Sequence, residues 1–197
     1  MADLASRGFG DFKQVNVRFL ASSRCDLFAA KNNKTLAETL DQKRYTRLRF
    51  EVERNYSDRL GEPLGEFLLG LKVAKDNFYR SFLNSYGDLE YCTFEIADSW
   101  ALGLRGVYFY SVDDEVKYVG RCKDSMKKRI NQGYGKIHPK NCYMDGQATN
   151  CRINALICEM KDRVSLWLLP LFDTDEIDSY EKSLLNVLDL AWNIQHG

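Results

Sequence analysis

The sequence predicts an α+β protein, and three observations in its second half indicate this fold class. Two short β-rich runs, residues 106–110 and 115–119, are separated by an Asp-Asp turn, as in a hairpin. A third run, residues 164–171, is almost continuously apolar, which is typical of a buried strand. Residues 173–189 then carry apolar side chains at helical spacing. Strands and helices therefore share this part of the chain.

The predicted hairpin carries a triplet of glycine, valine and tyrosine on each strand. Gly106-Val107-Tyr108 lies on the first strand, and Tyr118-Val119-Gly120 ends the second. Side chains alternate between the two faces of a strand, and residues of neighbouring strands lie opposite one another. We therefore expect Tyr108 and Tyr118 to project from the same face and to share one pocket.

Two helices and a loop are expected between the hairpin and the third strand. Residues 123–132 are basic, have helix-forming composition and contain Arg129. Residues 135–150 form a polar, turn-rich insertion, and residues 151–160 form a second helix that Thr149 or Asn150 can cap. The helix predicted at 173–189 carries Glu181.

The first hundred residues predict a separate α+β region. Residues 35–42 and 63–83 have helical spacing, and Pro63 suits a first turn. Residues 47–53 alternate charged and apolar side chains and residues 89–96 are β-rich, so both are strand candidates. Positive and negative charges cancel here, and no catalytic motif is found. We expect a region of residues 1–103, which contacts DNA, contacts a second subunit or extends the core, followed by a domain of residues 104–197.

Composition restricts the class of protein. With 197 residues, 45% of them hydrophobic, the chain can bury a core in one or two domains. No apolar run approaches the length of a membrane span, and the N-terminus lacks the apolar region of a signal peptide. Six cysteines without a CxxC pair predict reduced thiols in the cytoplasm. The order Cys122, His138, Cys142, Cys151 matches no standard zinc spacing, so we expect buried thiols instead.

Charge is segregated along the chain although the net charge is zero. Residues 117–152 carry nine basic and two acidic side chains, and residues 159–197 carry three basic and eight acidic ones. A basic face for phosphate groups, with the acidic surface away from it, is the expected result.

Five landmarks in this order resemble the GIY-YIG nuclease superfamily, and they cover roughly residues 104–195. The family carries the two tyrosine triplets, an arginine on the following helix, a glutamate on a helix after the third strand, and an asparagine shortly beyond. The matching residues here are Tyr108, Tyr118, Arg129, Glu181 and Asn193. The resemblance implies a small antiparallel three-stranded sheet flanked by helices and the hydrolysis of a phosphodiester bond.

The resemblance also implies a role for each residue. Tyr108 would activate water as a general base, directly or through a water, and Arg129 would favour its phenolate and hold the phosphate. Glu181 would ligate one divalent cation, Mg²⁺ or Mn²⁺. Tyr118 would hydrogen-bond the phosphate or the water, and Asn193 would orient its neighbours or the scissile group.

The chain departs from the family pattern after the arginine. Relatives have His or Tyr four residues beyond it, where this chain has Gly133, and a tyrosine follows at Tyr134. We expect Gly133 to end the helix in a left-handed cap that turns Tyr134 back to the pocket. The insertion and Arg121, where some relatives have histidine, resemble a restriction-endonuclease subset. The DNA-binding candidates are Arg121, Lys127, Lys128, Tyr134, Lys136, Lys140 and Arg152.

Two functions of different class follow from these observations. The first is a metal-dependent DNA endonuclease, of a restriction, defence or mobile-element kind. The second is a non-catalytic nucleic-acid-binding module that keeps the fold. DNA is the expected partner and a membrane is not, and a homodimer on a symmetric site is left open. A small-molecule enzyme is disfavoured because the chain has no phosphate-binding Gly-rich loop and no catalytic triad.

Overall fold

The computed structural model describes residues 10–194 and shows a mixed α+β fold with two antiparallel sheets. The chain divides into two compact units. The first comprises Met1–Ser22, Cys92–Lys136 and Leu156–Gly197, and the second comprises Ser23–Tyr91 and Ile137–Ala155. These units are not divided at residue 103: most of the insertion belongs to the second unit, and residues 10–22 and 92–103 belong to the first.

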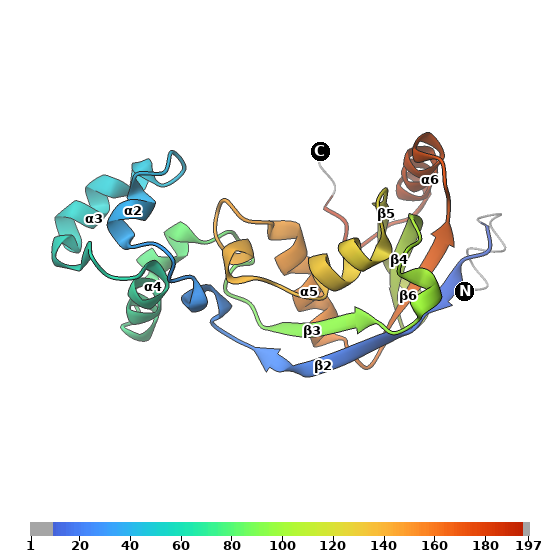
Figure 1. Cartoon of the computed structure of the whole chain (residues 1–197), viewed down its shortest axis with the longest axis horizontal. Helices are drawn as coiled ribbons and strands as arrows, with labels where there is room; N and C mark the ends of the chain where they lie inside the picture. Colours follow the sequence, from blue (N-terminus) through green and yellow to red (C-terminus); the bar gives the residue numbers. More distant parts are fainter. Residues whose placement is uncertain (1–9, 195–197) are drawn as a thin grey trace. The chain divides into compact units, whose positions relative to one another are not determined.

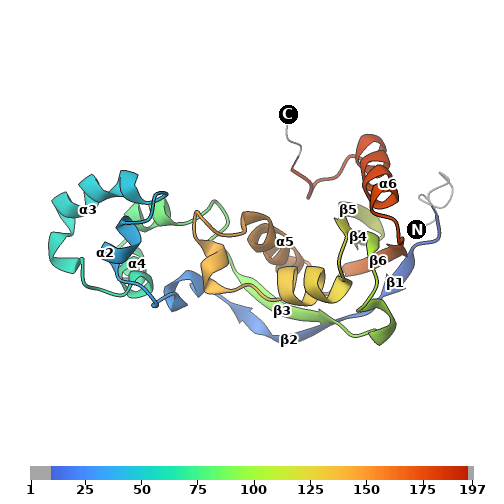
Figure 2. The ribbon, with the colours of Figure 1, turned by 45° about the horizontal axis from the view of Figure 1, so that its top comes forward.

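The first unit is built on a four-stranded antiparallel sheet in the order β1-β6-β4-β5 (Figures 1 and 2). Its strands are β1 (Lys13–Val15), β6 (Val164–Pro170), β4 (Gly106–Val112) and β5 (Glu115–Cys122). The hairpin and the third strand are confirmed, but the expected number of three strands is wrong. The fourth strand, β1, pairs with β6, and its three residues are too few for a periodic pattern to reveal.

The two faces of this sheet pack differently. Val107, Phe109 and Val119 point to an apolar cluster that includes Ile177 and Leu184 of α6 (Thr174–Val187), which lies beside β4 and β5 (Figure 2). The tyrosines of β4 and β5 alternate with these residues and pack on the other face against η6 (Lys127–Tyr134). Every residue of β4 is buried because both of its faces are covered.

Gly106 is required where β4 begins. Its φ is +145°, and a Cβ atom there would lie 2.0 Å from the carbonyl oxygen of Leu169 on β6. Only glycine combines this backbone conformation with so close an approach. The first glycine of the motif therefore serves strand pairing.

The three helices expected in the second half are present, but the one expected at 123–132 is η6, which begins four residues later and ends two residues later. In α6, Asp173 caps the N-terminus and accepts hydrogen bonds from the backbone N–H groups of Asp175 and Glu176, both at 2.9 Å. The second predicted helix is α5 (Ala148–Glu159). It begins three residues earlier than expected, so Thr149 and Asn150 lie inside its first turn and do not cap it.

The second unit contains α2 (Leu36–Leu40), α3 (Arg49–Asn55) and α4 (Leu64–Val73). Thr35 and Glu38 form a capping box on α2, as a start near Thr35 predicts. The strand predicted at 47–53 is wrong, because Leu48 and Val52 are buried at helical spacing while Phe50 is exposed. The helix predicted at 63–83 is interrupted after α4, where Lys75 has a φ of +60°.

The remaining elements are a second sheet and several short helices. A two-stranded sheet pairs β2 (Val17–Arg24) with β3 (Tyr91–Ile96), and the second of these strands was expected. Short 3-10 helices are η1 (Leu27–Ala30), η2 (Thr46–Leu48), η3 (Ser57–Arg59), η4 (Asn77–Phe82), η5 (Ser99–Ala101) and η7 (Pro139–Cys142). No helix in residues 10–194 is both long enough and apolar enough to cross a membrane.

Candidate active site

Three tyrosine hydroxyls converge on the η6 face of the sheet. Tyr108 donates a hydrogen bond of 3.2 Å to the hydroxyl of Tyr134, and the hydroxyls of Tyr118 and Tyr134 are 2.9 Å apart. The rings of Tyr108 and Tyr118 lie 6.2 Å apart, which confirms that the two motif tyrosines share one pocket. Tyr108 is fully buried and Tyr118 is half-buried, so Tyr118 is the member nearer to solvent.

A π-helical turn brings Tyr134 into this cluster. In η6 the Gly135 N–H bonds the Ile130 carbonyl five residues earlier, at 2.7 Å. The wider turn places Tyr134 on the same side of η6 as Arg129. The guanidinium carbon of Arg129 lies over the Tyr134 ring, 5.9 Å from its centre. The expected left-handed cap at Gly133 is wrong, because Gly133 lies inside η6 and has no positive φ. Tyr134 follows Arg129 by five residues, one more than in the family, and the wider turn of η6 accommodates this additional residue.

Gly120, the glycine of the second triplet, also lies where a side chain does not fit. A Cβ atom there would lie 2.6 Å from the Tyr108 hydroxyl and 2.8 Å from the Tyr118 ring, inside a buried cluster. We expect Gly120→Ala to push the Tyr108 hydroxyl away from Tyr134 and to cost about 1–3 kcal/mol of unfolding free energy, as overpacking does. Denaturant unfolding measures this, with Gly103→Ala as control, because nothing lies within 4 Å of a Cβ atom there. Equal stability of the two variants would contradict the close packing.

Arg129 links the tyrosines to the other side of strand β5. Its side chain is exposed overall, and its Nη2 donates to the backbone carbonyl of Arg121 at 3.0 Å. Burial of the guanidinium lowers its pKa, but three neighbouring tyrosine hydroxyls raise the pKa more, so it stays above the ordinary value. The positive charge of Arg129 in turn acts on Tyr108, Tyr118 and Glu181, where it lowers each pKa. Arg129 is thus the cation common to both parts of the site.

Burial dominates the ionisation of the tyrosines. It raises the pKa of Tyr108 well above its ordinary value, and Tyr134 and Tyr118 raise it further, against the opposing effect of Arg129. Burial likewise raises the pKa of Tyr118. Both side chains are therefore neutral phenols at neutral pH in the free protein. Arg129 favours the phenolate of Tyr108 as expected, but the loss of solvent outweighs it.

Glu181 lies on α6 within a group of charged side chains at the end of β5. Arg121 Nη1 contacts Glu181 Oε2 at 3.1 Å and Asp178 Oδ1 at 2.9 Å, and Lys123 Nζ contacts Asp178 Oδ2 at 2.6 Å. Burial raises the pKa of Glu181, and Arg121 partly opposes this. The expected separation of acidic and basic surfaces is wrong here, because Asp178 and Glu181 of α6 form ion pairs with Arg121 of β5 and with Lys123, which follows β5.

The donor atoms at Glu181 fit a divalent cation in their chemistry. Carboxylate oxygens are hard ligands that Mg²⁺ prefers, and a cationic nitrogen of Arg121 already lies between oxygens of Asp178 and Glu181. No group of three or more His, Cys, Asp or Glu side chains placed to hold a metal ion is found among residues 10–194. Water and substrate oxygens would complete the coordination of a cation at Glu181.

Asn193 holds the edge of the sheet. Its Oδ1 accepts from the Val119 N–H at 2.9 Å, and its Nδ2 donates to the Val119 carbonyl at 2.8 Å. The side chain therefore pairs with β5 as a neighbouring strand would. It orients the strand between Tyr118 and Gly120, and its amide is engaged by the backbone and not directed at the tyrosine hydroxyls.

The remaining DNA-binding candidates divide between the units. Lys127, Lys128 and Lys136 are exposed in the first unit, and Lys128 forms an ion pair of 2.5 Å with Asp124. The other two, Lys140 and Arg152, belong to the second unit, where the Arg152 guanidinium lies 5.9 Å from the ring centre of Tyr86.

None of the six cysteines, all of which lie within residues 10–194, forms a disulfide bond. Cys122 belongs to the first unit, and His138, Cys142 and Cys151 belong to the second. Cys142 and Cys151 hydrogen-bond each other, and the Cys142 sulfur lies 3.9 Å from the Tyr91 hydroxyl. Side chains in such contacts are packed in a core and are not arranged around an ion.

Three side chains near the site are not among the residues predicted from the sequence: Tyr110, Asp178 and Lys123. Tyr110 lies two residues after Tyr108, so the alternation along a strand could have placed both on one face. Asp178 precedes Glu181 by three residues, a spacing that puts both on one side of a helix. Lys123 follows the end of β5 and had no signal apart from its charge.

The Tyr110 hydroxyl is buried and has no hydrogen-bond partner in the described part of the chain. An unpaired buried hydroxyl destabilises a protein by about 1–3 kcal/mol. We therefore expect Tyr110→Phe to leave the free energy of unfolding unchanged or to raise it by about 1 kcal/mol. Tyr143→Phe is the control, because the Tyr143 hydroxyl donates to the Phe28 carbonyl at 2.9 Å and its loss should destabilise. A decrease in Tyr110→Phe as large as in this control would show that the Tyr110 hydroxyl is bonded.

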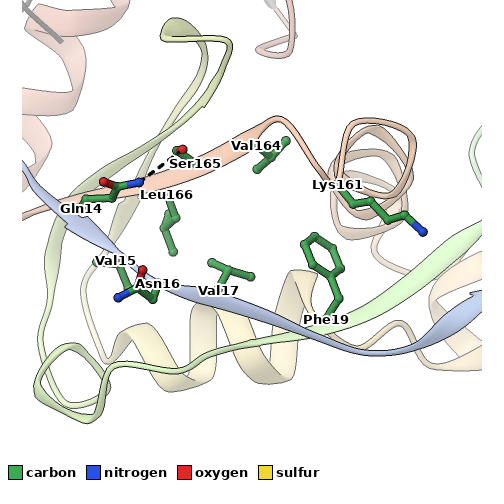
Figure 3. Close-up of a pocket in the computed structure, with 9 residues that line it drawn as sticks. All are labelled: Gln14, Val15, Asn16, Val17, Phe19, Lys161, Val164, Ser165 and Leu166. Carbon is green, nitrogen blue, oxygen red and sulfur yellow. Dashed lines mark hydrogen bonds between the residues drawn. The ribbon is translucent and has the colours of Figure 1, made fainter.

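A separate pocket of about 250 Å³ lies between the start of β6 and the β1–β2 segment (Figure 3). Val17, Phe19 and Leu166 contribute to its apolar wall, and Gln14 donates to Ser165 at 3.4 Å across the strands. None of the predicted site residues lines this pocket. It is distinct from the tyrosine cluster.

The structure thus brings together Tyr108, Tyr118, Tyr134 and Arg129, and links them through Arg121 to Glu181. Protein-family models, curated proteins and solved structures were compared with the chain, and none of them matches it. The function is therefore inferred from the geometry of these residues and from the sequence resemblance.

Proposed function

We propose that this protein is a metal-dependent DNA endonuclease with a GIY-YIG-like site. One observation supports this most: three tyrosine hydroxyls converge at hydrogen-bond distance beside Arg129, although Tyr108, Tyr118 and Tyr134 come from different elements. A sheet needs no such network for stability. Hydroxyl donors beside a guanidinium suit a phosphodiester, whose charge grows as it is cleaved.

Glu181 would hold the divalent cation, which when bound neutralises phosphate charge and acidifies a water. Arg129 would bind two oxygens of the scissile phosphate with its planar guanidinium, and its exposed position allows this. Asn193 would keep Tyr118 in place by fixing the backbone of β5.

The tyrosines would move a proton along their hydrogen bonds. Tyr108 is fully buried, so its hydroxyl reaches a bound substrate only through Tyr134 or after a rearrangement of the pocket. Tyr134 contacts both other hydroxyls, which makes it the link between Tyr108 and the half-buried Tyr118. Because Tyr108 is a neutral phenol in the free protein, it would act as general base through a relay: its hydroxyl would take up the proton of the attacking water while its own proton passes to Tyr134, and Tyr134 would pass a proton through Tyr118 to the leaving oxygen.

The second candidate function is a DNA-binding module without catalysis. Two observations favour it: Glu181 Oε2 is in contact with Arg121, and Tyr108 is buried. In the free protein the carboxylate is therefore paired with a cation, and the phenol hydroxyl is not exposed to a substrate. DNA is the proposed partner in either case, and a homodimer on a symmetric site belongs to the first. A cytoplasmic location is part of both proposals, and the six cysteines, none of which forms a disulfide among residues 10–194, agree with it.

A plasmid assay separates the two functions. Supercoiled DNA is incubated with the protein and Mg²⁺ or Mn²⁺, nicked and linear products are measured, and DNA binding is measured in parallel. Nicking that EDTA abolishes supports the endonuclease. Binding without nicking at high protein concentration, with either cation, would favour the module, and neither binding nor nicking would refute both.

A further inference from the structure

We propose that Arg121 is a movable cation that makes metal binding at Glu181 depend on DNA. In the free protein its guanidinium would occupy the place of the metal, and on a duplex it would transfer to a phosphate. This inference rests on the proposed endonuclease function and adds a means of regulation to the same site.

The contacts of Arg121 support this role. A single nitrogen, Nη1, lies 2.9 Å from Asp178 Oδ1 and 3.1 Å from Glu181 Oε2. An incoming divalent cation would need the oxygen of Glu181 that this nitrogen contacts. Two cations at one carboxylate oxygen repel each other, so Arg121 must leave or the metal binds weakly.

The surroundings of Arg121 allow it to leave. Its side chain is 45% exposed, whereas that of Glu181 is only 16% exposed, so a phosphate can approach the arginine more easily than it can approach the glutamate. A phosphate offers the planar guanidinium two oxygens at once, which a shared carboxylate pair does not.

Lys123 makes the exchange selective. Its Nζ contacts Asp178 Oδ2 at 2.6 Å, on the oxygen that Arg121 does not contact. When Arg121 moves to DNA, Asp178 therefore keeps a cation in contact, whereas Glu181 loses the cation that contacts it and keeps only the attraction of Arg129. The carboxylate that loses its contact with a cation is thus Glu181, the proposed metal ligand.

Binding of Mn²⁺, measured by the electron paramagnetic resonance signal of the free ion, tests this without any cleavage. The wild-type protein is titrated alone and with a short duplex, and we expect the duplex to raise Mn²⁺ affinity about tenfold or more. Arg121→Gln should bind Mn²⁺ about tenfold more tightly than the wild type without DNA and should gain little from the duplex. Arg121→Lys retains the charge and should resemble the wild type.

Lys182→Gln is the matched control, because Lys182 is exposed on the same helix as Glu181 and its substitution removes one positive charge. An equal gain in affinity in this control would show general electrostatics and overturn the proposal. Unchanged affinity in Arg121→Gln would also overturn it, even if the wild type cuts DNA. If the wild type neither binds Mn²⁺ nor cuts DNA, the proposed function fails as well.

Discussion

Glu181→Gln is expected to reduce DNA cleavage by at least about a thousandfold while the protein stays folded. A bound metal contributes several kcal/mol to transition-state stabilisation, and about 4 kcal/mol corresponds to a thousandfold in rate. Glutamine keeps the size of the side chain but is a weak metal ligand. Burial raises the pKa of Glu181, so the charged form is disfavoured in the folded protein, and a neutral side chain should not lower stability at neutral pH.

The measurement is the rate of plasmid nicking in Mg²⁺, together with the melting temperature and the affinity for DNA. Glu176→Gln serves as the matched control, because Glu176 is an exposed carboxylate in the first turn of the same helix. The control should cut at the wild-type rate. Cleavage by Glu181→Gln at that rate would remove Glu181 from the site, and a large fall in its melting temperature would indicate a structural role instead.

Tyr108→Phe is expected to lower the cleavage rate by at least about a hundredfold, the usual scale for losing a general base. The ring remains and still fills the buried pocket between Tyr118 and Tyr134. Only the hydrogen bond to Tyr134 is lost, so the free energy of unfolding should fall by no more than about 1 kcal/mol.

Two measurements on the same variant distinguish catalysis from packing. If Tyr108 acts only in packing, Tyr108→Phe cuts normally and stability is lost only on truncation to alanine, by about 3–5 kcal/mol. If the hydroxyl takes part in proton transfer, the rate falls while stability is nearly kept. Tyr143→Phe again serves as control, because it loses a buried hydrogen bond within the second unit, whereas the motif residues belong to the first.

Local patterns in the sequence determined the elements that carry the candidate site. The hairpin, the strand at β6 and the helix α6 each span five or more residues with a clear period or a turn signal. The common face of Tyr108 and Tyr118 followed from the alternation of strand side chains and is confirmed by their ring contact. These features depend on neighbours in the chain, which is why one sequence is enough to predict them.

Longer-range packing decided the features that the sequence did not predict. The three residues of β1 form a strand only because the edge of β6 is available to them. Residues 47–53 alternate as a strand would, yet the burial of Leu48 and Val52 in the core of the second unit stabilises a helix. The apolar pattern of so short a segment fits both a strand and a helix, and packing against the core determines which of the two forms.

The arrangement of charges was also a property of the tertiary structure. Sequence alone placed Tyr134 one residue out of phase with Arg129, and only the wide turn of η6 brings both to the same face. The contact of Arg121 with Glu181 joins residues sixty positions apart, on a strand and a helix whose packing fixes their distance. The sequence thus determined which groups are present and on which elements, whereas the folded chain determined which of them ionise, which are buried and which neutralise each other, because these properties depend on distances through space.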